Sequence, residues 1–384
     1  MEIYILDNLY RPIDIVDVYE SFIWTERFSS AGDFQLDVIS NTKNRRRFTR
    51  GTNICITASK RVMTVVTIDD YIDADNRRML KVVGYSLEDI FKHRIIAYMF
   101  EGELVRWGPY NEVPKVHVET MYQGICGQGV INGGDVLDEV TMGSDLYPED
   151  TIPFPTEEVV YDPDIKDLYS AIKEICDKYN MGFRIVRDPT TNLLYFDVYM
   201  GSDRTSAQET LDAVIFSQDL GNFRNPHQIR SYATYKNVAY VVNATGHDIV
   251  YADGVDSSIE SFDRKVLVVV AKDELDSTQR IALGKEELAK NRWFSGIDGE
   301  IDTTWPYVYE KDYYLGDLVE IRDVDGTCEY MQVTEQIIVS DKEGDRAFPT
   351  LVDNLFITPG SWIAWDFAQE WDDLSDTLYW ADLP

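Results

Sequence analysis

Two stretches near opposite ends of the chain share one spacing of glycine and hydrophobic residues. Gly51 is followed at +3 and +5 by Ile54 and Ile56, then by a hairpin pattern, a polar turn and a further strand. Gly316 is followed by hydrophobic residues at the same two distances and by the same succession. Chance similarity between strand-rich segments is one explanation. The other is a repeat, which predicts two related barrels with a different region between them.

Short strand patterns fill the first 97 residues and return after residue 208. They are rich in β-branched and aromatic residues and are separated by turn-forming residues, a spacing typical of barrels and sandwiches. We therefore expect one barrel-like tube domain over 1–97 and a second over 209–355, the latter with a helix-containing insertion near 276–293. The helix of this insertion is expected to turn four residues inward: Ile281, Ala282, Leu288 and Ala289.

The region between the two expected barrels has helical periodicity. Its clearest helix is predicted over 163–180, with Asp162 as the cap and Pro163 in the first turn. Two strand patterns joined by a turn follow this helix. The sequence therefore predicts an α/β domain over 98–208, and the fold class is mainly β with an α+β insertion.

The charge of the chain excludes some classes of partner. Lys and Arg number 36 against 68 Asp and Glu, which gives a net charge of −32. Affinity for phosphates comes from cationic side chains, so wrapping of nucleic acid and binding to anionic membranes are both disfavoured. No apolar run approaches the ~20 residues of a membrane span, and the N-terminus lacks the pattern of a signal peptide. We therefore predict no membrane binding.

The sequence contains no recognisable catalytic pattern. GxSxG and HExxH are absent, the four histidines are far apart, and the four scattered cysteines favour reduced buried thiols. The stretches "GICGQG" at 124–129 and "DVDG" at 323–326 favour turns over a dinucleotide or calcium site. We therefore predict a non-enzyme with no cofactor, metal or catalytic residue. The abundance of aromatic and acidic residues also suits a carbohydrate-binding module or a glycan-degrading protein, which stays as the alternative.

Three groups of residues are candidates for an oligomer or partner interface. In "SFIWTERF", Trp24 is expected in core or interface packing, and Glu26 with Arg27 at a rim contact. The basic cluster "KNRRRFTR" is either a solvated loop or a docking site for carboxylates of a neighbour, with nucleic acid as a third option. The segment 356–384 is acidic and rich in tryptophan, a residue type that often anchors interfaces. The candidates in the basic cluster are Arg45, Arg46 and Arg47, and those in the C-terminal segment are Trp362, Trp365 and Trp371.

Three stretches resemble the tail-hub proteins of siphophages, also called tail-associated or baseplate-hub proteins. They are "YESFIWTERFSSAGDF" (19–34), "FSQDLGN" leading into "YATYKNVAYVVNATG" (216–246) and "YEKDYYLGDLVEI" (309–321), in the order of that family. The resemblance implies two barrel-like tube domains and peripheral α/β domains in each subunit. It also implies a homotrimeric ring of six similar barrels that adapts a six-fold tail to a three-fold tip.

The resemblance also implies a place and partners. The place is the tail tip of the virion, with the protein made in the host cytoplasm. The partners are the distal tail protein ring, the C-terminus of the tape-measure protein, and a fibre or receptor-binding protein, with genomic DNA as a transient passenger. Many members of the family carry a C-terminal cell-wall-cutting or fibre domain, which we do not expect for a sequence that stops at Pro384.

Overall fold

The structure is a computed structural model, and contacts between residues divide it into two compact units. The first unit comprises residues 1–226 and 298–384, and the second comprises 227–297. This division does not decide the domain boundaries expected from the sequence, which stay a prediction. The structure describes residues 1–100, 103–127, 137–143, 145–252, 254–273, 275–300, 306–322 and 328–352.

The N-terminal part of the first unit is a run of antiparallel strands, paired in the order β2-β1-β5-β6-β7-β4-β3. The strands are β1 (Ile3–Leu6), β2 (Pro12–Val16), β3 (Ser21–Arg27), β4 (Asp33–Ile39), β5 (Asn53–Ile56), β6 (Met63–Ile72) and β7 (Arg78–Ser86), with the short helices α1 (Thr42–Arg47) and η1 (Leu87–His93). Aliphatic and aromatic residues form the core of this region, where the rings of Trp24 and Phe34 stack with centroids 6.2 Å apart. We call β1 and β3 to β7 the first strand set.

A second strand set follows the same plan. It consists of β15 (Ile215–Ser217), β16 (Arg224–Ser231), β20 (Phe294–Glu300), β21 (Leu318–Arg322), β22 (Cys328–Asp341) and β23 (Gly344–Val352). Its pairing order, β15-β21-β22-β23-β20-β16, matches β1-β5-β6-β7-β4-β3 of the first set, and corresponding strands occur in the same order along the chain. One pairing differs, because β15 is parallel to β21 whereas β1 is antiparallel to β5.

Backbone hydrogen bonds show that the two sets are a repeat rather than a chance likeness. The amide of Gly51 donates to the carbonyl of Val65 at 3.0 Å, and that of Gly316 donates to the carbonyl of Val333 at 2.8 Å. Both glycines have positive φ angles, of 82° and 92°. The strand that contains each valine has a register shift directly after it, as at a β-bulge. The glycine spacing of the sequence therefore marks a shared backbone structure.

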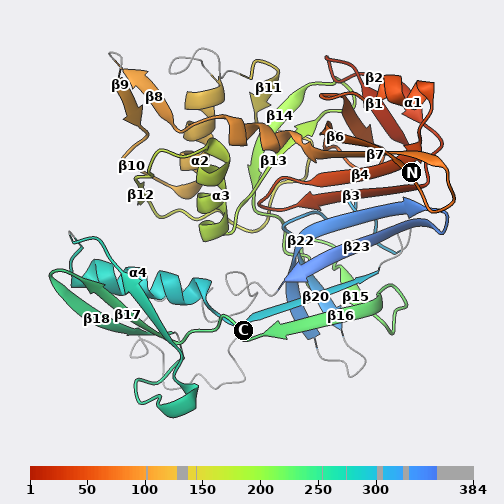
Figure 1. Cartoon of the computed structure of the whole chain (residues 1–384). Coiled ribbons are helices and arrows are strands. Elements are labelled where there is room, and N and C mark those ends of the chain that lie inside the picture. Colours follow the sequence, from red (N-terminus) through yellow and green to blue (C-terminus); the bar gives the residue numbers. More distant parts are fainter. Residues whose placement is uncertain are drawn as a thin grey trace. The chain divides into compact units, whose positions relative to one another are not determined.

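The two sets join through β3 and β22, which pair antiparallel and lie side by side in Figure 1. Within the described residues the pairing of strands does not close into a ring, because β2 and β16 stand at its two ends. Among the described strands of one chain, the barrel-like strand sets therefore belong to one open sheet, with no closed barrel.

An α/β region lies between the two sets in sequence. Helices α2 (Pro114–Tyr122) and α3 (Leu168–Tyr179) lie together beside the hairpin of β13 (Gly182–Arg187) and β14 (Leu194–Tyr199), as Figure 1 shows. Their apolar side chains form one buried cluster with that hairpin. The remaining elements are β8 (Ala97–Phe100), β9 (Glu103–Arg106), β10 (Tyr110–Glu112), the π-helical turn η2 (Gln123–Gly127), β11 (Val140–Met142) and β12 (Val159–Tyr161).

Helix α3 begins later than the sequence predicts. Its cap is Asp167, whose carboxylate accepts a hydrogen bond from the amide of Ser170 at 2.8 Å, so the expected cap Asp162 is wrong. The reason is tertiary pairing. The amide of Leu168 donates to the carbonyl of Arg94, and Asp167 bridges to the strand-like segment after η1, which keeps the preceding residues extended.

The second unit is a small three-stranded sheet with one helix. The sheet has the order β18 (Gly246–Tyr251), β17 (Val238–Asn243), β19 (Val266–Val270), and α4 (Ser277–Lys290) packs on it; the short turn η3 (Ser261–Asp263) precedes β19. Asp276 and Gln279 form a capping box at the start of α4. In the chain the elements β17 to α4 form the connection between β16 and β20, where the first set has only the short turn between β3 and β4.

The inner face of α4 differs from the prediction. Leu288 is buried as expected, whereas Ile281, Ala282 and Ala289 are exposed. Arg280 and Gly284 share the buried face instead, each four residues from the next. A Cβ at residue 284 would lie 2.7 Å from the side chain of Val250, so only glycine lets the helix approach the sheet this closely.

Two further expectations from the sequence concern reduced, buried cysteines and membrane-spanning segments. None of the four cysteines forms a disulfide; Cys55, Cys126 and Cys176 are buried as predicted, whereas Cys328 is exposed at the start of β22. In the part of the chain that the structure describes, no helix has both the length and the apolar character needed to cross a bilayer.

Candidate functional site: the joint between the strand sets

The joint is an antiparallel pairing of residues far apart in sequence. Strand β3 pairs with the second half of β22, so that Arg27 lies opposite Glu335 and Trp24 opposite Ile338. The core of the first set extends across the joint, because Ile338 packs within it. The joint is therefore a continuous part of the sheet rather than a contact between two finished surfaces.

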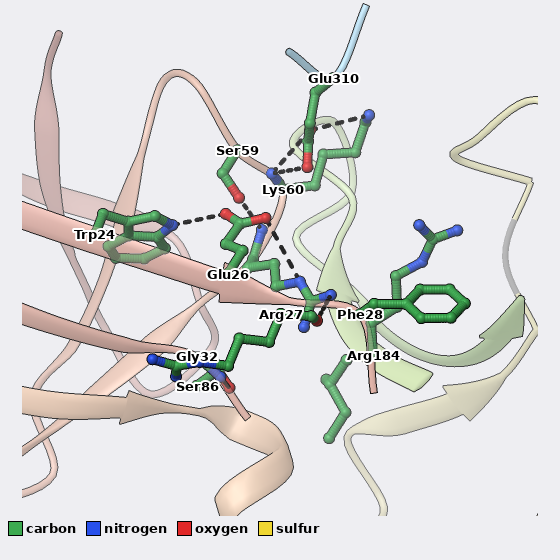
Figure 2. Close-up of polar contacts among 12 residues, drawn as sticks. Trp24, Glu26, Arg27, Phe28, Gly32, Ser59, Lys60, Ser86, Arg184 and Glu310 are labelled. Carbon is green, nitrogen blue, oxygen red and sulfur yellow. Dashed lines mark hydrogen bonds and ion pairs between the residues drawn. The ribbon is translucent and has the colours of Figure 1, made fainter. Parts of the chain in front are cut away.

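A buried carboxylate lies at the centre of the joint. Glu26 is 0 % exposed and accepts hydrogen bonds from Nε1 of Trp24 at 2.6 Å and from the hydroxyl of Tyr309 at 2.8 Å. Figure 2 shows the bond between Trp24 and Glu26. The rim contact expected for Glu26 is therefore corrected, because its carboxylate is enclosed by its own chain. Trp24 is also 0 % exposed and belongs to the core.

Arg27 forms the polar edge of the joint. Its guanidinium donates to Glu335 of β22 at 2.6 Å and to Asp33 of β4 at 2.9 Å. Burial lowers the pKa of this arginine, but the two carboxylates raise it by more. Arg27 thus connects the first strand set to the second within one chain, and the rim contact expected for it from the sequence stays a prediction.

Arg61 supplies the positive charge beside the joint. It is 1 % exposed and lies 2.8 Å from Glu88 and 3.6 Å from Glu26, measured from guanidinium nitrogen to carboxylate oxygen. Burial lowers its pKa, but Glu88 and its other neighbours raise it well above the ordinary value. Removing one partner of such a buried pair typically costs about 3–5 kcal/mol, because it leaves an uncompensated charge. Nothing in the sequence singled out Arg61, since its partners are distant along the chain.

A second buried polar group ties the joint to the α/β region. Glu310 accepts hydrogen bonds from the amide and the ammonium group of Lys60, at 3.2 and 3.3 Å, and from the hydroxyl of Tyr147 at 2.8 Å. Burial, with a contribution from Glu26, raises the pKa of Glu310. The first set, the second set and the α/β region therefore share one polar network, shown in part in Figure 2, which fixes their arrangement within the first unit.

The predicted basic cluster is a short helix rather than a loop. In α1, Arg45 pairs with Asp70 at 2.8 Å and Arg47 with Asp14 at 2.6 Å, while Arg46 is exposed. The tryptophans of the predicted C-terminal interface, Trp362, Trp365 and Trp371, lie outside the described residues.

The outer halves of β6 and β22 differ in exposure although they occupy the same place in the repeat. The outer half of β22 alternates between buried and partly exposed residues, because β3 covers its edge. The outer half of β6 is exposed almost throughout, with Val66 50 %, Ile68 38 % and Ile72 65 % exposed. Among the described strands, β7 alone pairs with this half of β6. An unpaired edge with apolar residues is a surface that favours further strand pairing.

The described residues hold no group of three or more His, Cys, Asp or Glu side chains arranged to hold a metal ion. The chemistry that this arrangement supports is assembly: strand pairing through main-chain hydrogen bonds, with charged side chains at the rim.

A repeated strand set around an α/β region is an architecture found in tail proteins of phages. The fold is similar to that of a 43 kDa tail protein of prophage MuSo2 from Shewanella oneidensis, with a TM-score of 0.57, 12 % identity, and coverage of 92 % of this chain and 98 % of that one. It is also similar to a tail protein from Neisseria meningitidis MC58, with a TM-score of 0.58, 10 % identity, and coverage of 93 % and 98 %. A chain of the Francisella PdpA-VgrG complex matches with a TM-score of 0.51 and 9 % identity, over 93 % of this chain and 53 % of that one.

Residues 2–351 match the family of Siphovirus ReqiPepy6 Gp37-like proteins, and the chain belongs to that family. Its fold is similar to that of the phage tail proteins named above, which agrees with the resemblance found in the sequence. No curated protein sequence matches the chain.

Proposed function

We propose that three copies of this chain form a closed ring at the tip of the tail, the hub that adapts a six-fold tube to a three-fold tip. The observation that carries the proposal is the difference between the exposed edge of β6 and the covered edge of β22. Each chain supplies one completed joint and one strand edge that is ready for a second joint.

The repeat identifies the strand that would complete the second joint. Within the chain, β3 covers β22; in the repeat, β16 occupies the place of β3 and β6 the place of β22. The same joint between chains would therefore pair β16 of one copy with β6 of the next. A head-to-tail contact of this kind closes when the rotation per copy fits a ring. Three copies then present six similar strand sets, which meets the six-fold symmetry of a tube.

The charges of the two edges favour this pairing. In sequence, β16 carries Arg224 and Arg230, whereas the outer half of β6 carries Asp69 and, already paired with Arg45 and Arg78, Asp70. Opposite charges across a strand pair contribute about 0.2–1 kcal/mol each and help to set the register. The inferred joint thus resembles the existing one, where Arg27 meets Glu335.

The acidity of the chain suits a passage for DNA. Three chains carry three times −32, or −96 charges. An acidic wall repels phosphates and so lets a genome slide without binding it. The partners that we propose are the distal tail protein ring, the tape-measure protein's C-terminus and a fibre or receptor-binding protein. Family membership supports a place among tail components, and the ring geometry supports contacts above, within and below it.

Light scattering of the purified protein tests the ring. We expect a mass near 133 kDa, three times 44.2 kDa. The double variant Ile68→Lys/Ile72→Lys places two charges on the edge of β6 and is expected to weaken assembly at least ~100-fold, giving a folded monomer. The matched control Val160→Lys/Ile165→Lys changes two somewhat more exposed residues of the α/β region and should remain a trimer.

Other outcomes would contradict the proposal. A wild-type monomer, or a trimer that tolerates both lysines on β6, would rule out this ring. A monomer that binds glycans on an array would favour the carbohydrate-binding alternative. Cleavage of a cell-wall preparation, lost on changing a pair of carboxylates, would favour the glycan-degrading alternative.

A further inference from the structure

A groove with two unlike rims lies beside the N-terminal hairpin of the first unit. It has a volume of about 650 Å³ and runs between the β1–β2 hairpin and the segment formed by α1 and the following turn. Figure 1 shows α1 next to β1 and β2. One rim, the β1–β2 hairpin, exposes Leu9 (61 %) and Ile13 (64 %) beside the ion-paired side chains of Asp7, Arg11 and Asp14. The other rim carries Arg46 and Arg50, both exposed.

The groove concentrates positive charge in a strongly acidic chain. Within the described part of the chain, neither Arg46 nor Arg50 has an ion-pair partner. The side chain of Arg47 is only 7 % exposed; one terminal nitrogen contacts Asp14 at 2.6 Å, and Nε meets no hydrogen-bond acceptor among the described residues. A buried donor without a partner costs about 1–3 kcal/mol, so an acceptor in the groove would be stabilising.

The two rims together select the chemistry of an occupant. Arginine pairs with carboxylates and also stacks on aromatic rings, most strongly on tryptophan. Leu9 and Ile13 would cover apolar side chains. The fitting occupant is therefore a segment in which carboxylates alternate with large aromatic residues and which carries no positive charge.

The chain itself contains such a segment. Residues 353–384 hold seven Asp or Glu, four Trp and no Lys, Arg or His. The 32 residues after Val352 can span up to about 105 Å when extended. That length is sufficient to reach the groove of the same chain or of a neighbouring copy.

We propose that the groove formed by Leu9, Ile13, Arg46, Arg47 and Arg50 is the docking site for this chain's own acidic, tryptophan-rich segment, residues 353–384. The inference goes beyond the proposed ring and does not depend on it, because a monomer can dock its own segment.

A photoreactive group on the rim formed by the β1–β2 hairpin tests the docking in the full-length protein. Leu9 is replaced by benzoylphenylalanine, the protein is irradiated, and the cross-linked peptides are identified by mass spectrometry. We expect the cross-links to fall within residues 353–384. A mixture of ¹⁴N- and ¹⁵N-labelled protein shows whether the segment comes from the same chain or from a neighbour.

Charge reversal gives the decisive comparison. In the Arg46→Glu/Arg50→Glu variant the rim repels the acidic segment, and the yield of cross-links is expected to fall at least ~10-fold. The control Lys43→Glu/Lys311→Glu makes the same change in net charge at exposed lysines outside the groove and should retain the wild-type yield. Equal yields in the two variants, or no cross-links to residues 353–384, would overturn the proposal. In purified virions, cross-links from Leu9 to another protein or to nucleic acid would overturn it as well.

Discussion

The two strand sets of this subunit share a backbone and differ in what surrounds them. In the second set, β22 is covered along its edge by β3 and the turn before β21 packs against the α/β region. In the first set, the corresponding edge of β6 is open and the corresponding turn at Gly51 faces open space. The same backbone arrangement therefore occurs twice: its strand edge is covered by another strand in the second set and is exposed in the first. The comparison teaches that the same backbone unit can have either a covered or an open strand edge, depending on what lies beside it.

The residue that follows each matched glycine differs between the two sets, in line with the different surroundings of the two turns. The residue after Gly51 is Thr52, which makes local contacts with Thr49. The residue after Gly316 is Asp317, which is 1 % exposed and accepts hydrogen bonds from the guanidinium of Arg204 at 2.8 Å and from the amide of Ser202 at 2.8 Å. The repeated backbone therefore fixes the turn, while the environment determines the side chain.

The largest expected difference is between the covered joint and the open edge. Trp24→Ala removes a fully buried aromatic residue and should lower the free energy of unfolding by about 3–5 kcal/mol. Ile72→Ala changes a residue that is 65 % exposed and should cost less than about 0.5 kcal/mol in the free subunit. Urea unfolding of both variants, at concentrations below assembly, measures the contrast. Equal losses would show that the edge of β6 is not free.

The second largest expected difference is in the stability lost when Gly51 or Gly316 is replaced by alanine. Both have positive φ, so Gly51→Ala is expected to cost about 1 kcal/mol from backbone strain alone. A Cβ at Gly316 would also lie 2.6 Å from the ring of Phe28 and 2.7 Å from the carbonyl oxygen of Met200, so Gly316→Ala should cost about 3 kcal/mol or more. Thermal unfolding of the two variants distinguishes these values, and a larger loss for Gly51→Ala would refute the assignment of the open and packed turns.

The smallest expected effect is a pH dependence at the second turn. Burial raises the pKa of Asp317 to about 6, although Arg204 acts in the opposite direction. The folded state then binds this proton more tightly than the unfolded state, so the contribution of Asp317 to stability falls as pH rises from about 4 to 6.

Asp317→Asn removes this titration. The difference in unfolding free energy between the wild type and Asp317→Asn should shrink by about 2 kcal/mol between pH 4.5 and pH 7, since each pKa unit corresponds to 1.36 kcal/mol. Denaturant unfolding at the two pH values measures it. An identical pH slope in the two proteins would mean that Asp317 titrates normally.

Much of the fold could be predicted from local pattern. The mainly β class, the α/β region and the repeat all follow from residue spacing, because side-chain period and turn chemistry are local properties. The errors arose where tertiary contacts decide. Asp167 caps α3 because the preceding residues pair with the segment after η1, and Gly284 faces inward because a small residue permits close packing.

The site was less accessible to prediction. The stretch "WTER" indicated that Trp24, Glu26 and Arg27 matter. The alternation of residues along a strand, however, does not show whether a carboxylate is exposed or is buried beside hydrogen-bond donors from distant parts of the chain. Glu26 is buried because Tyr309 and Arg61 reach it from other parts of the chain. Arg61 and Glu310 had no local signal at all. Family resemblance supplied the class of protein, while the covered and open edges emerged only from strand pairing.

The position of the second unit in the chain has a consequence for how such proteins diversify. Its elements β17 to α4 form the link between β16 and β20, at a place where the first set needs only a tight turn. Closing a longer link adds little entropy cost, about 0.6 kcal/mol for each doubling of length. Evolution, or an engineer, can therefore exchange this module for another while the strands on either side keep their pairing.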